Sequence, residues 1–133
     1  MGSALLGGWL ERGIDASDVI VVEPFEDTAR DVAERFGVAV VPTSDDISPD
    51  AAPNTIVFAV KPQSMDDTAP AYARFAGAEA VFLSIAAGKT IDYFQGILGA
   101  EAAIVRAMPN TPAAVGRGIT VACANANTDD AQI

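Results

Sequence analysis

The sequence has no histidine, a single cysteine, Cys123, and few basic residues. Without histidine, catalysis that depends on an imidazole is excluded. One cysteine allows no intrachain disulfide, and without histidine the usual zinc ligand sets cannot be assembled, so we expect no metal site. Eight Lys and Arg residues stand against 18 Asp and Glu residues, which gives a net charge of −10. Such a chain offers no basic stripe to nucleic acid phosphates or anionic membranes, and we expect neither as a partner.

Signals for secretion, lipidation and membrane insertion are also missing. The apolar start at Ala4–Leu10 has no preceding Lys or Arg and ends at Glu11, which is unlike a signal peptide. Leu6 stands where N-myristoylation requires Ser or Thr. Since no apolar run approaches the roughly 18 residues that span a bilayer, we expect a cytoplasmic protein.

The chain has the length and apolar content of one globular domain. It has 133 residues, of which 50% are hydrophobic, and its mean hydropathy is +0.28. Short apolar runs alternate with amphipathic segments, as in an α/β fold of three layers whose parallel sheet is covered on both sides. The expected strands are Val19–Val22, Val38–Val41, Thr55–Val60, Ala80–Ile85, Ala103–Val105 and Ile119–Cys123.

Helix signals separate these runs. Gly13 and Gly37 stand where two helices would end. Ser64 and Asp67 have the spacing of a capping box and predict a helix start, although Pro70 would kink or restart that helix. Thr90 is expected to cap the next helix. Residues 42–54 are rich in Pro, Asp, Ser and Thr and are expected to form a loop.

Ligands of an open parallel sheet bind outside the carboxyl ends of its strands. Small, charged or rigid residues follow the expected strands at Glu23–Pro24, Lys61–Gln63, Ala86–Gly88 and Met108–Pro112. Small and rigid residues just after strand ends let an extended ligand approach the backbone closely. Residues of each kind are nevertheless common in ordinary loops.

Glu23 is the acidic candidate among these tips. A carboxylate there can hydrogen-bond ribose hydroxyls, although a solvated or helix-capping role is the more ordinary one. Glu23 follows Gly2 by 21 positions, close to the separation of about 20 between the last glycine of a dinucleotide fingerprint and its acidic residue. A complete G-x-G-x-x-G is not present.

The acids after Val19–Glu23 and a later Lys-Pro pair also resemble landmarks of a phosphoacceptor receiver domain. It requires an Asp at the tip of its third strand, whereas the corresponding run here ends in Lys61. Its Lys-Pro pair also comes much later in the chain, so this alternative is disfavoured.

Four blocks together resemble the pyrroline-5-carboxylate reductase family: Met1–Leu5, Phe58–Gln63, Ser84–Gly88 and Arg106–Pro112. They occur in the family's order and at similar spacing, and the resemblance covers essentially the whole chain. It implies a two-domain, NAD(P)H-dependent reductase that transfers hydride to the cyclic imine 1-pyrroline-5-carboxylate, its small-molecule substrate, and forms L-proline. Residues 1–133 would be a partial NAD(P)-binding, Rossmann-like domain.

The resemblance also implies roles for individual residues. Gly2 would be the last glycine of the phosphate loop, at a helix N-terminus whose N–H groups suit a pyrophosphate, and Glu23 would lie near the adenosine ribose. Asn110 and Thr111 would lie towards the nicotinamide. Hydride transfer needs no protein nucleophile, and we assign no catalytic residue. The residues expected to line the cofactor are Ala59, Val60, Lys61, Pro62, Ile85, Ala86 and Ala87.

The sequence leaves the choice between NADP and NAD open. Glu23 would repel the 2′-phosphate of NADP, which favours NAD, whereas Arg30 could approach that phosphate. Asp45 or Asp46 occupies a region where some relatives have an amide.

Family members have a first strand and opening glycines before the position of Met1, and a helical dimerisation domain after the region of Ile133. We therefore expect a doubly wound sheet that lacks its first, central strand and is split, with no dimerisation domain, although full-length family members are homo-oligomeric. Without the central strand, about four apolar side chains would lose burial, at a cost of roughly 6 to 12 kcal/mol. This loss is comparable with the stability of a whole domain, so we expect marginal folding or aggregation.

Two further alternatives remain open. One is a non-catalytic nucleotide-binding or interaction fragment of such a reductase. The other is a related dehydrogenase with the same nucleotide domain, such as a β-hydroxyacid or prephenate dehydrogenase, against which the block Met108–Pro112 argues.

Overall fold

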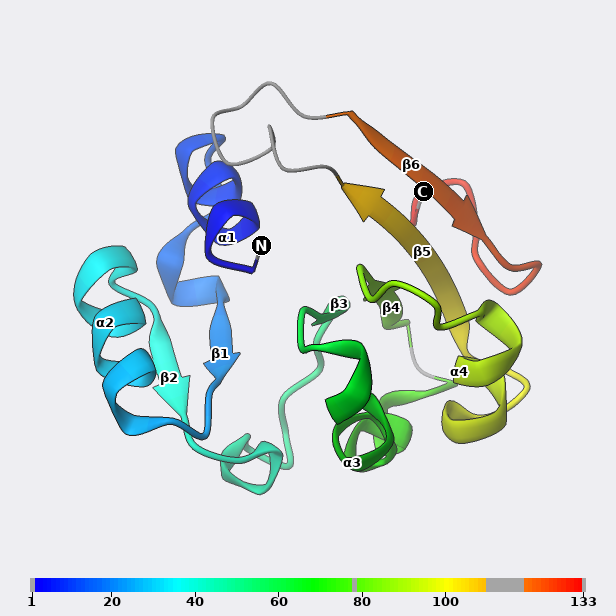
Figure 1. Ribbon diagram of the computed structural model, residues 1–133, viewed down its shortest axis with the longest axis horizontal. Helices are drawn as coiled ribbons and strands as arrows, with labels where there is room; N and C mark the ends of the chain where they lie inside the picture. The colour runs from blue at the N-terminus through cyan, green and yellow to red at the C-terminus, as the bar shows by residue number, and fades with distance from the viewer. Residues whose placement is uncertain (1, 78, 110–118, 133) are drawn as a thin grey trace.

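The computed structural model describes residues 2–77, 79–109 and 119–132 and has helices packed on two separate sheets (Figure 1). The α-helices are α1 (Gly2–Glu11), α2 (Glu26–Phe36), α3 (Met65–Thr68) and α4 (Ile91–Leu98). The strands are β1 (Ile20–Val22), β2 (Ala39–Val41), β3 (Thr55–Phe58), β4 (Val81–Ser84), β5 (Ala103–Pro109) and β6 (Thr120–Ala124). Short 3-10 helices are η1 (Ala16–Asp18), η2 (Ser44–Asp46), η3 (Pro62–Ser64) and η4 (Ala69–Phe75).

The sheet is divided, as the sequence predicts. Strands β1 and β2 form a parallel pair, while the second sheet has the order β3-β4-β5-β6. Strands β3, β4 and β5 are parallel, with Phe58 opposite Ser84. The α/β class and the split are therefore confirmed for the described part of the chain.

The expectation of an all-parallel sheet is wrong at β6, which runs antiparallel to β5. Only residues 110–119 separate these strands. A parallel connection needs a crossover of about a dozen residues or more, usually a helix, whereas an antiparallel neighbour needs no crossover.

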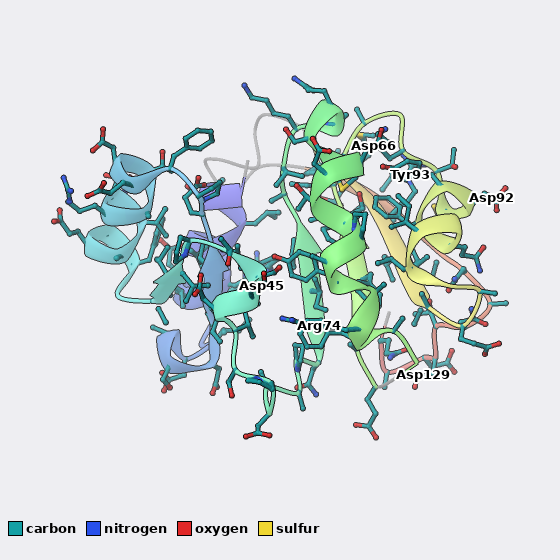
Figure 2. The ribbon with its side chains drawn as sticks, turned by 90° about the horizontal axis from the view of Figure 1, so that it is seen from below. Asp45, Asp66, Arg74, Asp92, Tyr93 and Asp129 are labelled. Carbon is teal, nitrogen blue, oxygen red and sulfur yellow. The ribbon has the colours of Figure 1, made fainter. Side chains whose placement is uncertain are left out.

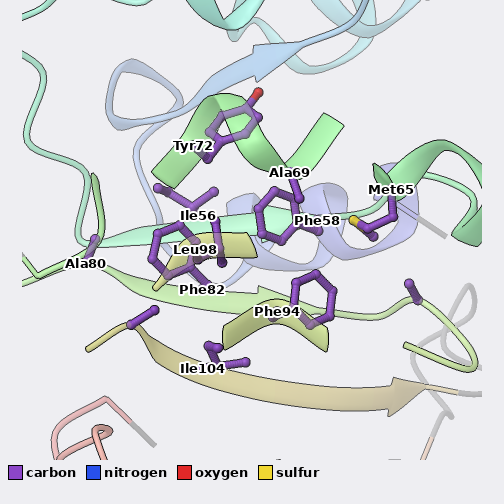
Figure 3. Close-up of a cluster of buried hydrophobic side chains, with 12 residues drawn as sticks. Ile56, Phe58, Met65, Ala69, Tyr72, Ala80, Phe82, Phe94, Leu98 and Ile104 are labelled. Carbon is purple, nitrogen blue, oxygen red and sulfur yellow. The ribbon is translucent and has the colours of Figure 1, made fainter. Parts of the chain in front are cut away.

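Helices α3, η4 and α4 pack on one face of the larger sheet and bury most of its aromatic side chains (Figure 3). The rings of Phe82 and Phe94 both lie nearly parallel to the ring of Phe58, with centroid distances of 6.1 and 5.7 Å. Phe94 and Met65 are completely buried. This cluster fixes α3 and α4 against the strands that precede them.

A second cluster joins α1 and α2 to the smaller sheet. Leu6 of α1, Val32 of α2 and Val38 are buried together. Strand β1 is less well covered, because Ile20 remains 50% exposed. The marginal folding expected from the sequence stays a prediction, and thermal unfolding of the chain would test it.

Several local signals are confirmed. Gly37 ends α2 in a left-handed conformation, with φ of 67°. Thr90 caps α4, since its side-chain oxygen accepts a hydrogen bond of 3.1 Å from the Tyr93 N–H. Helix α3 ends at Thr68 and continues as a 3-10 helix with Pro70 in its first turn, as the proline predicts.

Other boundaries differ from the prediction. Ser64 makes no side-chain cap, and the reciprocal capping box occurs instead between Thr43 and Asp46. Strand β3 ends at Phe58 rather than at Val60. Strand β5 continues beyond Val105 to Pro109 because β6 pairs with this extension. In the described residues, no helix is long and apolar enough to cross a membrane.

Candidate functional site at the carboxyl ends of the strands

The loops that follow β3 and β4 leave the sheet side by side. Because these strands are parallel and Phe58 is opposite Ser84, both loops start at the same edge. The Ile85 N–H donates a hydrogen bond of 3.3 Å to the Phe58 carbonyl. The buried Ser84 hydroxyl oxygen accepts from the Ala86 N–H at 3.2 Å. The two loops are thus joined where they begin.

The N-terminus of α1 meets the first of these loops. A Cβ added to Gly2 would lie 3.2 Å from the Cβ of Ala59, tighter than most real contacts of this kind. Gly2 is the first residue of a ten-residue helix, and the first N–H groups of a helix have no intrahelical acceptors. Backbone donors and a positive helix end therefore lie beside the carboxyl edge of the larger sheet.

The loop after β3 presents both rigid and charged groups. Val60 is half-buried against the core cluster, whereas Lys61 is exposed and forms no salt bridge with a described residue. Pro62 begins the 3-10 helix η3, and the Lys61 carbonyl accepts from the Ser64 N–H at 2.9 Å. The Lys61 ammonium is therefore available to an anionic ligand.

The loop after β4 is built of small residues. Ala86 is 4% exposed, while Ala87 and Gly88 are exposed. Gly88 has φ of 74°, a left-handed conformation that favours glycine. The backbone of this loop is therefore open to close approach.

Glu23 lies at the end of the smaller sheet. Its N–H donates to the Val41 carbonyl at 3.0 Å, and its Oε1 accepts from the Phe25 N–H at 3.1 Å, at the start of α2. The Glu23 carboxylate is thus bonded to the residue before α2 rather than to an N–H of the helix itself, and α2 has no side-chain cap.

Arg30 and Asp46, two residues that bear on cofactor choice, already have partners. The Arg30 guanidinium pairs with Glu26 at 3.1 Å and with Asp27 at 3.8 Å. The Asp46 carboxylate accepts hydrogen bonds from the N–H and hydroxyl of Thr43. Both groups are therefore engaged in the structure, Arg30 by exposed ion pairs of little strength and Asp46 by local hydrogen bonds to Thr43.

The predicted strand tip at Met108–Pro112 is described only in part. Asn110 and Thr111 lie outside the described residues. Met108 and Pro109, which the sequence places at a strand tip, belong to β5 itself.

Two hollows of about 670 and 680 Å³ lie at the opposite, amino-terminal edge of the larger sheet, beside Asn54. Neither is lined by a residue expected to bind the cofactor, so the candidate site lies on an open edge rather than in either hollow.

The structure also reveals a polar cluster that the sequence does not predict, formed by Asp66 of α3, Lys89 and Tyr93 of α4. The Tyr93 hydroxyl donates a hydrogen bond to Asp66 Oδ1, and Figure 2 shows the two side chains turned towards one another. Lys89 Nζ lies 3.7 Å from the same oxygen and 4.3 Å from the centroid of the Tyr93 ring. Since 27 positions separate Asp66 from Tyr93, no local spacing signal could have found the cluster.

These contacts shift the pKa values of Tyr93 and Asp66. Desolvation by burial, the hydrogen bond to Asp66 and its negative charge raise the pKa of Tyr93 to about 12. The hydrogen bond from Tyr93 and the charge of Lys89 lower the pKa of Asp66. Around neutral pH, the phenol is therefore a donor and the carboxylate an acceptor.

Comparison with known proteins connects this geometry to a family. Residues 1–88 match the family model described as NADP oxidoreductase coenzyme F420-dependent. Pyrroline-5-carboxylate reductase from Mycobacterium tuberculosis (strain CDC 1551 / Oshkosh) is 37% identical over 90% of this chain and 42% of its own length. The Escherichia coli (strain K12) reductase is 33% identical over 95% of this chain and 46% of its own length.

Solved structures agree with this match. The Coxiella burnetii pyrroline-5-carboxylate reductase superposes with a TM-score of 0.90 at 27% identity, covering 98% of this chain and 48% of that one. The Plasmodium falciparum pyrroline carboxylate reductase with NADP bound gives 0.81 at 25% identity, covering 99% and 47%. The chain thus spans a little under half the length of these relatives. It belongs to the NADP oxidoreductase family matched by residues 1–88, and its resemblance to pyrroline-5-carboxylate reductases is confirmed.

Proposed function

We propose that this chain is the NAD(P)H-binding part of a pyrroline-5-carboxylate reductase, which reduces 1-pyrroline-5-carboxylate to L-proline. The contact between the start of α1 and the loop after β3 carries the proposal, because it brings a helix N-terminus to the carboxyl edge of a parallel sheet. The resemblance to the reductases of Mycobacterium tuberculosis and Escherichia coli supports the reaction.

The residues at this edge fit a dinucleotide. Gly2 leaves no unstrained space for a larger side chain beside Ala59, so the backbone itself would face the pyrophosphate. Lys61 would add a positive charge in a chain whose net charge is −10. Asn110 and Thr111 would lie towards the nicotinamide. The remaining lining residues would be Ala59, Val60, Pro62, Ile85, Ala86 and Ala87.

The cofactor would supply the hydride. The part of this chain would be to bind and orient the dinucleotide and to keep its reactive end in a fixed place, since positioning alone can account for a large share of the rate. A protein nucleophile is not needed for this step, which agrees with a sequence that has no histidine.

The charges near the ribose end favour NADH over NADPH. Glu23 would accept hydrogen bonds from ribose hydroxyls and would repel a 2′-phosphate. Arg30, the candidate cation for that phosphate, is paired with Glu26 and Asp27.

Titration of the purified chain with NADH and with NADPH, followed by nicotinamide fluorescence or calorimetry, tests the binding half of the proposal. Saturable binding of at least one reduced dinucleotide is expected, with NADH bound more tightly. Failure of the folded chain to bind either would contradict the proposal.

The reaction is tested in a chimera in which this chain replaces the aligned part of the Escherichia coli reductase. Oxidation of NAD(P)H that depends on pyrroline-5-carboxylate is expected. A folded chimera that binds the dinucleotide without this activity would favour the non-catalytic alternative. Activity on β-hydroxyacids or prephenate instead would favour a related dehydrogenase.

A further inference from the structure

Two loops bear most of the residues proposed to line the dinucleotide, and each runs from a strand into a helix. Residues 59–64 connect β3 to α3, and residues 85–90 connect β4 to α4. At their beginnings the loops are joined by the hydrogen bond from Ile85 to Phe58. The spacing between the loops farther from the sheet depends on the contacts that join their other ends.

The cluster of Asp66, Lys89 and Tyr93 makes that second connection. Asp66 is in the first turn of α3, Lys89 is near the end of the second loop, and Tyr93 is in the first turn of α4. The hydrogen bond from Tyr93 and the contact from Lys89 both end on Asp66 Oδ1. The cluster therefore ties the far end of one loop to the far end of the other.

The residues of the cluster adjoin buried side chains of the core. Asp66 follows Met65, which is completely buried, and the Tyr93 ring packs edge-to-face on the buried Phe94 at 5.1 Å. The Lys89 side chain is only 22% exposed, because it lies between the carboxylate and the Tyr93 ring. Lys89 and Tyr93 are thus held against the packed core, and the more exposed Asp66 carboxylate receives contacts from both, which can maintain the spacing between the loops.

We propose that Asp66, Lys89 and Tyr93 form a clamp that fixes the spacing between the loop after β3 and the loop after β4, and so positions the residues that line the dinucleotide. This role rests on the proposed function. The three side chains act through the loops and are positioning residues.

Two variants weaken the clamp with little change of shape: Tyr93→Phe deletes only the hydroxyl and keeps the ring beneath Lys89, and Asp66→Asn removes the charge that both partners contact. Asp92→Asn is the matched control, since Asp92 is an exposed acid of the same α4 turn and points away from the cluster (Figure 2). Asp66→Glu tests rescue, because a longer carboxylate in an exposed position can still accept from Tyr93.

Two readouts are measured on each full chain: amide hydrogen exchange of residues 59–64 and 85–90, and the dissociation constant for NADH. Tyr93→Phe and Asp66→Asn are expected to speed exchange in both loops and to weaken NADH binding by up to about tenfold, the fold-change that corresponds to the loss of one hydrogen bond to a charged group. Asp92→Asn should change neither, and Asp66→Glu should restore part of both.

The outcomes separate this inference from the proposed function. Unchanged exchange in the two loops would overturn the clamp, whatever the cofactor does. Faster exchange with unchanged NADH affinity would overturn its positioning role. If the unmodified chain binds neither NADH nor NADPH, the proposed function fails and the positioning role fails with it, while exchange still decides whether the clamp holds the loops.

Discussion

Gly2, the first residue of α1, lies against Ala59, the first residue after β3, so closely that a Cβ at Gly2 would stand 3.2 Å from the Cβ of Ala59. The two residues belong to parts of the chain that pack on different sheets. Their contact therefore brings the start of α1 to the edge of the larger sheet where the proposed cofactor-binding residues lie. A larger side chain at position 2 would disturb this contact and so tests the site.

Gly2→Val should weaken dinucleotide binding at least tenfold, because the new side chain would push α1 away from Ala59 or cover its N-terminus. Gly8→Val is the matched control: Gly8 is in the same helix, and a Cβ there has no neighbour within 4 Å. Dissociation constants for NADH are measured for both variants. Equal affinities in the two variants would show that the contact has no role in binding.

Glu26→Ala combined with Asp27→Ala should shift cofactor preference towards NADPH by about tenfold. Removing both carboxylates frees the Arg30 guanidinium to approach a 2′-phosphate and removes two negative charges near it. Asp31→Ala is the control, since it frees Arg35 on the same helix. The ratio of NADH to NADPH affinity is the measurement, and an unchanged ratio in the double variant would place the ribose elsewhere.

The fold could be predicted from the sequence where local chemistry dominates. The left-handed Gly37 and the Thr90 cap are set by one or two residues and appear where expected. The direction of β6 depends instead on which edge of the sheet is available, and the lengths of β3 and β5 depend on their pairing partners. Those are properties of the assembled sheet, so apolar runs alone could not fix them.

The candidate site was predictable to a similar extent. Glu23, Ala59 and Ile85 lie directly after strand ends, as the alternation of strands and helices indicates. The cluster of Asp66 and Tyr93 was not predictable, because it depends on how α3 and α4 pack over Phe58 and Phe94. Likewise, only the structure reveals that the Glu23 carboxylate accepts a hydrogen bond from the Phe25 N–H.

Gly96→Ala should stabilise the chain by about 1 kcal/mol, since a glycine in a helix interior loses more backbone entropy on folding than alanine. Gly96 is an exposed residue of α4, and a Cβ there meets nothing within 4 Å. Gly99→Ala should have the opposite sign, because Gly99 ends α4 with φ of 109°. Denaturant unfolding measures both, and a destabilised Gly96→Ala variant would contradict this description of α4.

The stability contributed by Asp66 should depend on pH in one direction. Its pKa is lowered in the folded chain by the Tyr93 hydrogen bond and the Lys89 charge, so the unfolded state binds a proton more readily. The contribution is therefore fully present above the unfolded pKa, about 3.9, and is lost as pH falls through the lowered folded value. The unfolding midpoint of the unmodified chain should exceed that of Asp66→Asn around pH 6, and the difference should close in more acidic solution. Asp92→Asn removes the same charge without breaking these contacts and is the control for the loss of one exposed acid. A gap between the unmodified chain and Asp66→Asn that stayed constant down to about pH 2 would mean that the Asp66 carboxylate does not hold Tyr93 and Lys89 in solution.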